Sequence, residues 1–310
     1  MKLRRVAYIV LAIVLVWILV GFLATTPVIG DHPFWRRLRA RPVDFGLSSE
    51  TVSFLSQDGI RLIAWYIPAQ GTPQGTIILA HGIDGNRSDM LPRAWFLSRN
   101  HYNTLLVDLR AHGQSGGNYA TPGYMESRDV LGALSYLRHT RNINGPIVAF
   151  GHSYGAVASL YAAAKSPDLA AVIADGAFIS FENMMKRATI LLAQDPERSR
   201  LDRVGLRLAG TTAAEWVVLP MYYFRTGVWP SAARSDVFRA IPRIERPILF
   251  IAGEDDEICP PGDTKLMYEA AQSVEKDLLI VPNAGHDATY ATHPKLYEAT
   301  VVAFLQQALK

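Results

Sequence analysis

A five-residue segment, Gly-His-Ser-Tyr-Gly at 151–155, joins two runs of very different composition. The apolar run 146–150 precedes it and the small-residue run 156–164 follows it, which predicts a buried strand, a sharp turn and a helix. A turn this tight brings the strand and helix backbones together, and glycine at 151 and 155 avoids the clash that a Cβ atom would cause. We therefore expect Ser153 to adopt an unfavourable backbone conformation that lifts its hydroxyl clear of the sheet.

Short apolar runs alternate with helical patterns along the rest of the chain. Strands that are apolar throughout are typical of a parallel sheet covered on both faces, so we expect an α/β fold with a mostly parallel central sheet. The segments 50–56 and 61–67, on either side of Asp58-Gly59, predict an antiparallel hairpin before that sheet. The expected strands of the sheet are 76–81, 103–109, 146–152, 169–175, 247–252 and 277–282, and the expected helices are 89–99, 124–140, 155–165, 262–273 and 293–309.

The composition argues against several classes of protein. The chain has 310 residues and a net charge of +3, so no overall basic balance points to a nucleic-acid partner. Cys259 is the only cysteine, which rules out an internal disulfide and a cysteine-built metal site. The histidines show no metal-ligand spacing, and we expect no metal or other cofactor.

The first 30 residues predict a membrane anchor. No charged residue occurs from Val6 to Gly30, and about 20 apolar residues suffice to cross a bilayer core. A cleavable signal peptide is the rival interpretation, although its apolar region is usually about 7–15 residues long. We favour an uncleaved single-pass transmembrane anchor over 1–30, a basic linker over 31–48 and a folded body over 49–310.

Basic residues on both flanks of the apolar segment bear on its orientation. Lys2, Arg4 and Arg5 precede the segment without acidic neighbours, which favours an inner N-terminus and a body on the outer, periplasmic or extracellular side. The arginines of the linker oppose this orientation, and they lie either in solvent or against anionic headgroups. These linker residues are Arg36, Arg37, Arg39 and Arg41.

The chain supplies the groups that a nucleophilic serine needs. A serine hydroxyl is a poor nucleophile at neutral pH, so Ser153 requires a base, usually a histidine held by a carboxylate. When a G-x-S-x-G turn serves this purpose, the acid and then the histidine follow on loops after later strands. Here the apolar run 247–252 is followed by the acidic segment 254–257, and the run 278–282 is followed by Asn-Ala-Gly-His286.

From about residue 50 to the end, these segments resemble an α/β-hydrolase, and more narrowly the membrane-anchored bacterial hydrolases described as serine-aminopeptidase-like. In that family the catalytic aspartate lies three residues after a glycine and four before a proline. Asp256 matches this spacing, and Asp255 is the fallback. The resemblance implies that His286 takes the proton from Ser153 and that Asp256 orients the imidazole.

The resemblance also implies an oxyanion hole. Attack on a carbonyl creates an oxyanion that needs preorganised hydrogen-bond donors. His-Gly at 81–82 resembles the oxyanion loop of the family, and the donors would be the backbone N–H groups of Ile83 and Tyr154.

The segment 108–115 resembles a further family motif, with Ala111 where glycine is usual. We interpret Asp108 and Arg110 as structural residues, ion-paired and organising the loops beneath the site. His152 occupies a variable position of the turn, and we expect its side chain to point away from the nucleophile.

The strand–helix alternation breaks over about 179–246, which is far longer than a usual connection. We interpret this interval as a helical insertion, or lid, over the sheet edge that carries the site. Helices are expected near 181–194 and 201–209. The aromatic residues of 216–224 line an acyl pocket, touch the membrane or pack against the core, and the sequence leaves all three open.

Three functions fit this pattern. The first is a membrane-anchored serine hydrolase of carboxylic esters or thioesters that works through an acyl-enzyme. The second is amide hydrolysis of the aminopeptidase kind, which needs acidic groups in the insertion to hold a free amine. The third is a catalytically silent, membrane-tethered binding protein. The expected partners are a small acyl or peptidyl substrate and the lipid bilayer. The acidic candidates in the insertion are Glu182, Asp195, Glu197, Asp202 and Glu215.

Overall fold

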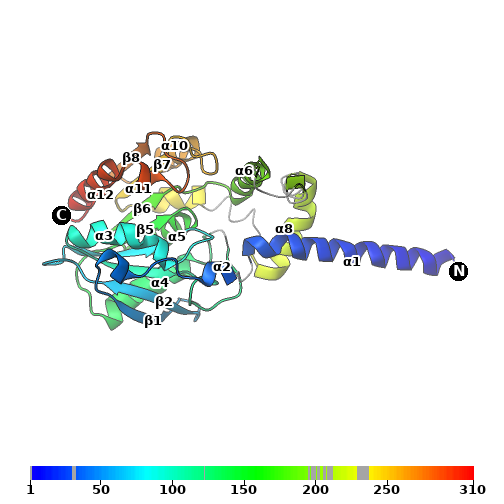
Figure 1. Ribbon diagram of the computed structural model, residues 1–310, viewed down its shortest axis with the longest axis horizontal. Coiled ribbons are helices and arrows are strands. Elements are labelled where there is room, and N and C mark those ends of the chain that lie inside the picture. The colour runs from blue at the N-terminus through cyan, green and yellow to red at the C-terminus, as the bar shows by residue number, and fades with distance from the viewer. Residues whose placement is uncertain are drawn as a thin grey trace.

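The computed structural model centres on an eight-stranded mixed sheet (Figure 1). It describes residues 2–29, 33–121, 123–194, 196, 200, 203–204, 207, 212–228 and 237–310. The strand order is β1-β2-β4-β3-β5-β6-β7-β8. β1 pairs antiparallel with β2, and β2 pairs antiparallel with β4, whereas all other neighbours are parallel. The predicted hairpin and the predicted mostly parallel sheet are therefore confirmed.

The strands are apolar because the inner ones are buried on both faces. Ile78 and Ala149 face one core layer, while their neighbours Ile77 and Phe150 face the other. The parallel strands end at one edge of the sheet, and the loops that follow them meet there. The strands are β1 (Glu50–Leu55), β2 (Arg61–Ile67), β3 (Gly75–Ala80), β4 (Tyr102–Asp108), β5 (Ile147–His152), β6 (Ala171–Asp175), β7 (Ile248–Gly253) and β8 (Lys276–Val281).

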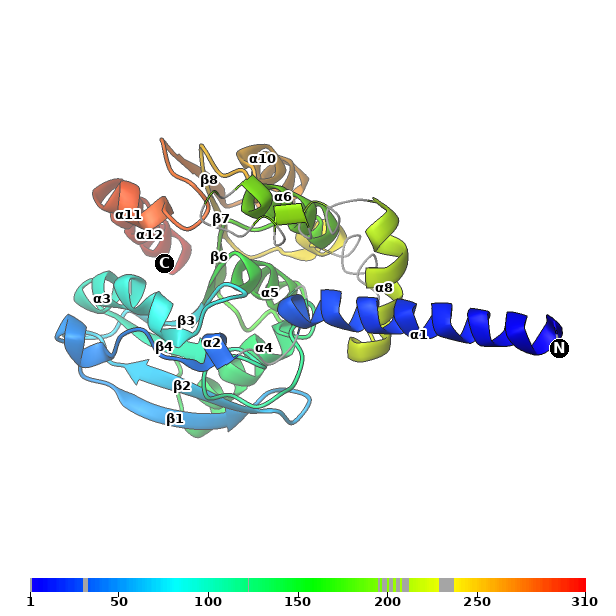
Figure 2. The ribbon, with the colours of Figure 1, turned by 45° about the vertical axis from the view of Figure 1, so that its right-hand side comes forward.

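Helices cover both faces of the sheet (Figure 2). α3 and α12 pack on one face, and α4, α5 and α10 pack on the other. The helices of the body are α2 (Pro33–Arg36), α3 (Leu91–Arg99), α4 (Ser127–Ser135), α5 (Tyr154–Ala163), α10 (Pro261–Ala270), α11 (Thr289–Thr292) and α12 (Pro294–Ala308). Shorter turns of helix are η1 (Pro42–Phe45), η2 (Arg87–Met90), η3 (Tyr136–Thr140) and η4 (Ile241–Arg243).

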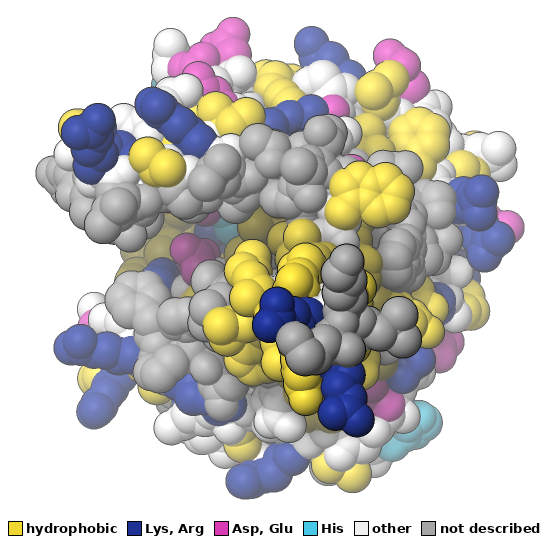
Figure 3. Space-filling view, turned by 90° about the vertical axis from the view of Figure 1, so that its right-hand side faces the viewer, with side chains coloured by type: hydrophobic (Ala, Val, Ile, Leu, Met, Phe, Trp, Pro, Cys, Tyr) yellow, Lys and Arg dark blue, Asp and Glu magenta, His cyan; other side chains and the backbone are white. Residues whose placement is uncertain are grey.

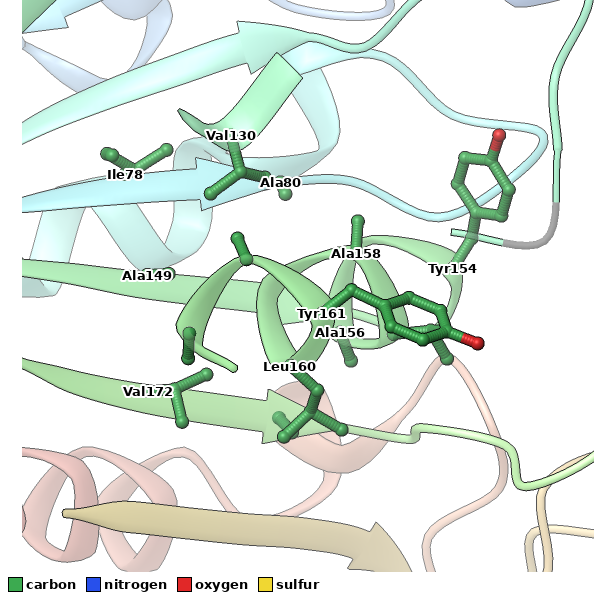
Figure 4. Packing of buried hydrophobic residues seen from close by; sticks show 14 of the residues in the cluster. Ile78, Ala80, Val130, Ala149, Tyr154, Ala156, Ala158, Leu160, Tyr161 and Val172 are labelled. Carbon is green, nitrogen blue, oxygen red and sulfur yellow. The ribbon is translucent and has the colours of Figure 1, made fainter. Parts of the chain in front are cut away.

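The small residues of α5 let this helix lie close to the sheet. Ala156 and Ala158 belong to the same buried cluster as Ala149 of β5 and Val172 of β6 (Figure 4). Every residue of α5 is buried. This close packing fixes the start of α5, immediately after Ser153, relative to the end of β5.

The N-terminal segment forms one long helix, α1 (Lys2–Ile29), which projects from the body (Figure 1). Its window Arg4–Phe22 has a mean hydropathy of 2.5, and only 6% of that window is buried. By length and composition this helix can cross a membrane. A signal sequence near an N-terminus meets the same two criteria.

The segment after α1 packs against the body. Trp35 is 6% exposed and stacks on His112 with 4.6 Å between the ring centroids. The Arg36 guanidinium donates to the carbonyl oxygens of Gly113 and Ser115. Arg39 forms an ion pair with Asp89 at 3.0 Å. These two arginines of the predicted linker thus contact the folded body.

The described part of the interval between β6 and β7 includes two long helices. They are α6 (Phe181–Gln194) and α8 (Thr212–Thr226). The expected helix over 201–209 falls largely outside the described residues. α8 contacts α1. The two helices are so close that a Cβ atom added at Gly21 would lie 3.1 Å from Cβ of Met221.

The prediction that Asp108 and Arg110 form an ion pair is wrong in its partners. Asp108 pairs with Arg87, and Arg110 pairs with Asp129 at 2.6 Å and with Asp58 at 2.7 Å. The two side chains lie only two residues apart at the end of a strand, and each finds a partner on a different loop. Spacing along the chain did not identify those loops.

Loss of the Arg110–Asp129 pair should destabilise the fold. The Asp129 carboxylate is fully buried and also accepts the backbone N–H of Arg110. Asp129→Asn leaves the buried guanidinium of Arg110 with the partly exposed carboxylate of Asp58 alone, so we expect it to lower the free energy of unfolding by about 2–3 kcal/mol. Denaturant unfolding of the full chain in detergent measures this loss. Glu50→Gln is the control, because Glu50 is 60% exposed in its pair with Arg141 and should cost at most about 1 kcal/mol. An equal loss of unfolding free energy in the two variants would contradict a stabilising role for the Arg110–Asp129 pair.

Candidate active site

Ser153 lies at the turn between β5 and α5, where the backbone is strained. Its φ of 52° and ψ of −115° are unfavourable for a residue with a side chain. A Cβ atom at Gly151 would lie 2.0 Å from the carbonyl oxygen of Gly155, and one at Gly155 would lie 2.3 Å from that of Ala80. The turn therefore has the geometry predicted from the sequence, and the glycines are required for the reason expected there.

The structure brings Ser153, His286 and Asp256 into one hydrogen-bonded chain. Nε2 of His286 lies 2.8 Å from Oγ of Ser153, and Nδ1 lies 2.7 Å from Oδ2 of Asp256. The three residues follow β5, β8 and β7 at the same edge of the sheet. Asp255, the fallback acid, is exposed, and its backbone N–H donates to the carbonyl oxygen of Ala284.

The Asp256 carboxylate is held by its own loop. Its Oδ1 accepts the backbone N–H groups of Ile258 at 3.0 Å and Cys259 at 2.7 Å. The residue is 2% exposed. This leaves Oδ2 aimed at the imidazole, which is the arrangement that fixes a histidine tautomer.

The surroundings of His286 favour its protonated form. Burial of the ring on its own lowers the pKa, but the hydrogen bond to the Asp256 carboxylate outweighs burial and raises the pKa above its usual value. An imidazolium that forms here is therefore stabilised. Burial also raises the pKa of the Cys259 thiol, which disfavours a thiolate beside the histidine.

The loop after β3 lies against Ser153. A Cβ atom added at Gly82 would lie 3.7 Å from Cβ of Ser153. Nε2 of His81 accepts the backbone N–H of Leu109 at 3.1 Å, and its Nδ1 donates to the carbonyl oxygen of Gly82. His112 is in hydrogen-bond contact with the carbonyl oxygen of Ile83. These contacts fix the course of the loop.

Two backbone N–H groups belong to the segments that border Ser153. Tyr154 is the first residue of α5, and the first N–H groups of a helix have no partner within that helix. Ile83 follows Gly82 in the loop after β3. Positive helix dipole and unpaired N–H groups at such a terminus favour a developing negative charge.

His152 is a site residue that sequence reasoning missed. Its ring centroid lies 5.5 Å from that of His286. Its Nε2 lies 3.1 Å from Oδ1 of Asp287, and its Nδ1 lies 3.5 Å from Oδ2 of Asp175. Burial lowers the pKa of His152, but the two carboxylates outweigh it and raise the pKa to about 9. A positive charge thus lies beside His286 at neutral pH. The sequence showed a histidine directly before Ser153, but it did not show that Asp175 and Asp287 lie beside this histidine in the fold.

The Asp175 carboxylate that faces His152 belongs to a buried cluster of hydrogen bonds. Asp175 accepts hydrogen bonds from Arg93 at 2.6 Å, Tyr297 at 2.7 Å and Thr289 at 3.0 Å. Arg93 is on α3, while the other two donors are on α11 and α12. The cluster ties the end of β6 to helices from both ends of the chain. The cluster fixes Asp175 in place, and the carbonyl oxygen of Asp175 accepts the backbone N–H of Ser153 at 2.7 Å.

Two groups of side chains among the described residues bring metal-ligand atoms within 4.8 Å of one another. They are His152, His286 and Asp287, and Asp256, Cys259 and His286. Both need a ring nitrogen of His286, and each of its nitrogens already contacts Ser153 or Asp256. A metal would compete with that hydrogen-bonded chain, so the donor geometry fits a metal poorly.

Comparisons with known proteins identify the family. Residues 71–291 match the family model described as "Serine aminopeptidase, S33". The chain belongs to this family of α/β-hydrolases. The S33-family hydrolase is 31% identical to the uncharacterized protein YqkD of Bacillus subtilis over 251 residues, which cover 80% of this chain and 76% of that protein.

Further relatives share most of the chain. The uncharacterized protein YfhR of Escherichia coli K12 is 27% identical over 270 residues, or 84% of the hydrolase and 82% of YfhR. The esterase Pf2001 of Pyrococcus furiosus matches with a TM-score of 0.70 and 22% identity, covering 88% of this chain and 97% of that one. At that identity the likeness to Pf2001 shows the fold.

Removal of the charge on His152 should alter the ionisation of His286. A neighbouring positive charge lowers the pKa of His286, since it disfavours a second cation. The carboxylates of Asp175 and Asp287 face His152, and Arg93 lies behind Asp175. In His152→Gln we therefore expect the acid limb of kcat/KM to move to higher pH. A pH profile on a soluble acyl ester measures the shift, with the exposed His139→Gln as control. An unmoved limb would show that His152 has no such influence.

Proposed function

We propose that this hydrolase cleaves carboxylic esters or thioesters through an acyl-enzyme. Ser153 is the nucleophile, His286 the general base and Asp256 the orienting acid. The observation that carries this proposal is the unbroken chain of contacts from Oγ of Ser153 through both ring nitrogens of His286 to Asp256, at 2.8 Å and 2.7 Å. A serine held by such a base has the reactivity that acyl transfer requires.

The proposed reaction has two halves. In the first, Oγ of Ser153 attacks the acyl carbon, and its proton passes to Nε2 of His286. The tetrahedral oxyanion is bound by the N–H groups of Ile83 and Tyr154. His286 then gives the proton to the departing alcohol or thiol, which leaves the acyl group on Ser153. In the second half, water loses a proton to His286 as its oxygen attacks the acyl carbon. The bond from that carbon to Oγ of Ser153 then breaks, Oγ takes the proton back from His286, and the acyl group leaves as a carboxylic acid.

Ester chemistry and peptide chemistry differ in what must hold the substrate. An aminopeptidase needs an acidic group for the free amine of its substrate, and the family description makes this the second candidate. Glu182 of α6 lies 3.6 Å from Lys186, so its charge is partly offset. Asp195, Glu197, Asp202 and the side chain of Glu215 lie outside the described residues. Pf2001, which shares this fold, is named an esterase, and that name supports an ester substrate, whereas the family description supports the aminopeptidase.

A catalytically silent binding protein is the least supported alternative. The serine, base and acid are all present and in contact, whereas a scaffold that only binds has no need of a strained serine in hydrogen-bond reach of a histidine.

We also propose that α1 anchors the hydrolase in a membrane, and that 31–48 connects it to a body over 49–310 with an insertion at about 179–246. The almost fully exposed apolar window Arg4–Phe22 supports the anchor, because lipid is the environment that such a surface favours. The side of the membrane on which the body lies stays a prediction.

Covalent labelling tests the nucleophile. A fluorophosphonate should label the full chain in detergent, and Ser153→Ala and His286→Ala should abolish this labelling because they remove the nucleophile and its base. Ser53→Ala is the matched control, since Ser53 is exposed on β1, and it should label like wild type. Labelling that persists in Ser153→Ala would contradict the nucleophile, and no labelling of wild type would favour the binding protein. Panels of acyl esters and aminoacyl amides would then distinguish ester from peptide hydrolysis.

The pH dependence tests the roles of His286 and Asp256. The raised pKa means that the imidazolium persists above pH 6.5, where it cannot accept the proton of Ser153. We therefore expect kcat/KM to rise with pH along a limb whose midpoint lies above 6.5. Asp256→Asn removes the carboxylate, so it should move that midpoint to lower pH and reduce kcat on the order of 10³–10⁴-fold. The exposed Asp255→Asn is the control. A larger loss of kcat in Asp255→Asn than in Asp256→Asn would show that Asp255, and not Asp256, is the orienting acid.

A further inference from the structure

The second insertion helix, α8, has three faces with different surroundings. Its body face carries Tyr222, which is 2% exposed and lies 5.9 Å, ring to ring, from Phe181. A second face, with Val217, Met221 and Arg225 at helical spacing, contacts α1. The third face adjoins the second on the helix surface, and none of its large aromatic side chains is buried.

The uncovered face of α8 is unusual for a helix in water. Trp216 is 80% exposed, Phe224 is 83% exposed and Tyr223 is 51% exposed. Trp216 and Tyr223 share one side of the helix, seven residues apart, and Phe224 extends that side toward the α1 contact. Contiguous exposed aromatic surface of this kind marks a site of interaction with a partner or a membrane.

α8 meets α1 at one end of the apolar window of α1. A Cβ atom added at Gly21 would lie 3.1 Å from Cβ of Met221 and 3.2 Å from the carbonyl oxygen of Val217, so glycine allows the close approach. The Arg225 guanidinium lies 4.4 Å from the ring centre of Phe22, the last residue of that window. It also donates to Oγ1 of Thr25 at 2.8 Å. The crossing point therefore lies where the apolar surface of α1 ends.

The direction of α8 suits the plane of a membrane. In both ribbon views α8 runs across the axis of α1 (Figures 1 and 2). In the view along α1, hydrophobic side chains cluster near the middle with some Lys and Arg side chains among them, and further Lys and Arg side chains lie at the rim of the same face (Figure 3). If α1 spans a bilayer, this face is the one turned toward the lipid.

We propose that α8 lies in the headgroup region of the bilayer, with Trp216, Tyr223 and Phe224 inserted among the upper acyl chains. Trp and Tyr are enriched at this depth because their rings are apolar and their N–H and O–H groups are polar. Continuity with the apolar surface of α1 identifies lipid as the occupant. α8 then rests on the membrane surface.

The inference rests on the proposed anchor, and the experiment separates the two. Nitroxide labels are placed one at a time at Phe224→Cys, at Val14→Cys on α1 and at Val274→Cys in the full chain, reconstituted in vesicles of phosphatidylcholine with some phosphatidylglycerol. Val274 is 96% exposed and precedes β8, at the sheet edge opposite the insertion, so it is the matched control. Wild type gives the blank, because Cys259 is buried.

Collision of each label with oxygen, which concentrates in lipid, is compared with collision with a water-soluble nickel complex. We expect the oxygen-to-nickel ratio at positions 224 and 14 to be severalfold higher than at position 274. A high ratio at 14 with a low ratio at 224 would overturn the role of α8 and leave the anchor intact. Low ratios at both would overturn the anchor and the inference together. A label at 224 that is immobilised and broadened by a second label, with both collision rates low, would assign the face to a second copy and also overturn it.

Discussion

The close approach of β5 and α5 around Ser153 is the constraint on which the rest of the site depends. The backbone at Ser153 has a φ of 52°, and such a conformation costs about 1–3 kcal/mol. It persists because α5 is buried along its whole length and because glycine at 151 and 155 removes the atoms that would separate strand from helix. The same turn presents the serine hydroxyl to His286 and places the N–H of Tyr154 at the start of a helix.

Charge in the layer beneath the turn is balanced within small groups of residues. Asp175 holds the Ser153 backbone through its carbonyl oxygen, and its carboxylate pairs with Arg93 and faces His152. Arg110 pairs with Asp129 and Asp58 on the opposite side of the sheet edge. These groups connect loops that lie far apart in the chain. They therefore fix the shape of the sheet edge that carries the candidate site.

The sequence predicted those features that depend on local pattern. Apolar strands, helical periodicity and the glycines of the turn located the sheet, its helices and Ser153, because each depends on neighbours in the chain. Family spacing located Asp256 and His286. Sequence reasoning failed where partners are distant: Arg110 was paired with Asp108 although it contacts Asp129, and no role beside His286 was foreseen for His152. The contact of α8 with α1 joins residues about 200 apart and left no signal in either segment.

The central claim is that Ser153 carries the acyl group between the two halves of the reaction. Rapid quenching of the full chain during turnover of an activated acyl ester, followed by peptide mass spectrometry, tests this most directly. We predict that the peptide containing Ser153 gains the mass of one acyl group and loses it as hydrolysis finishes. An acyl group found instead on Cys259, or sustained turnover with no acylated peptide, would contradict the account.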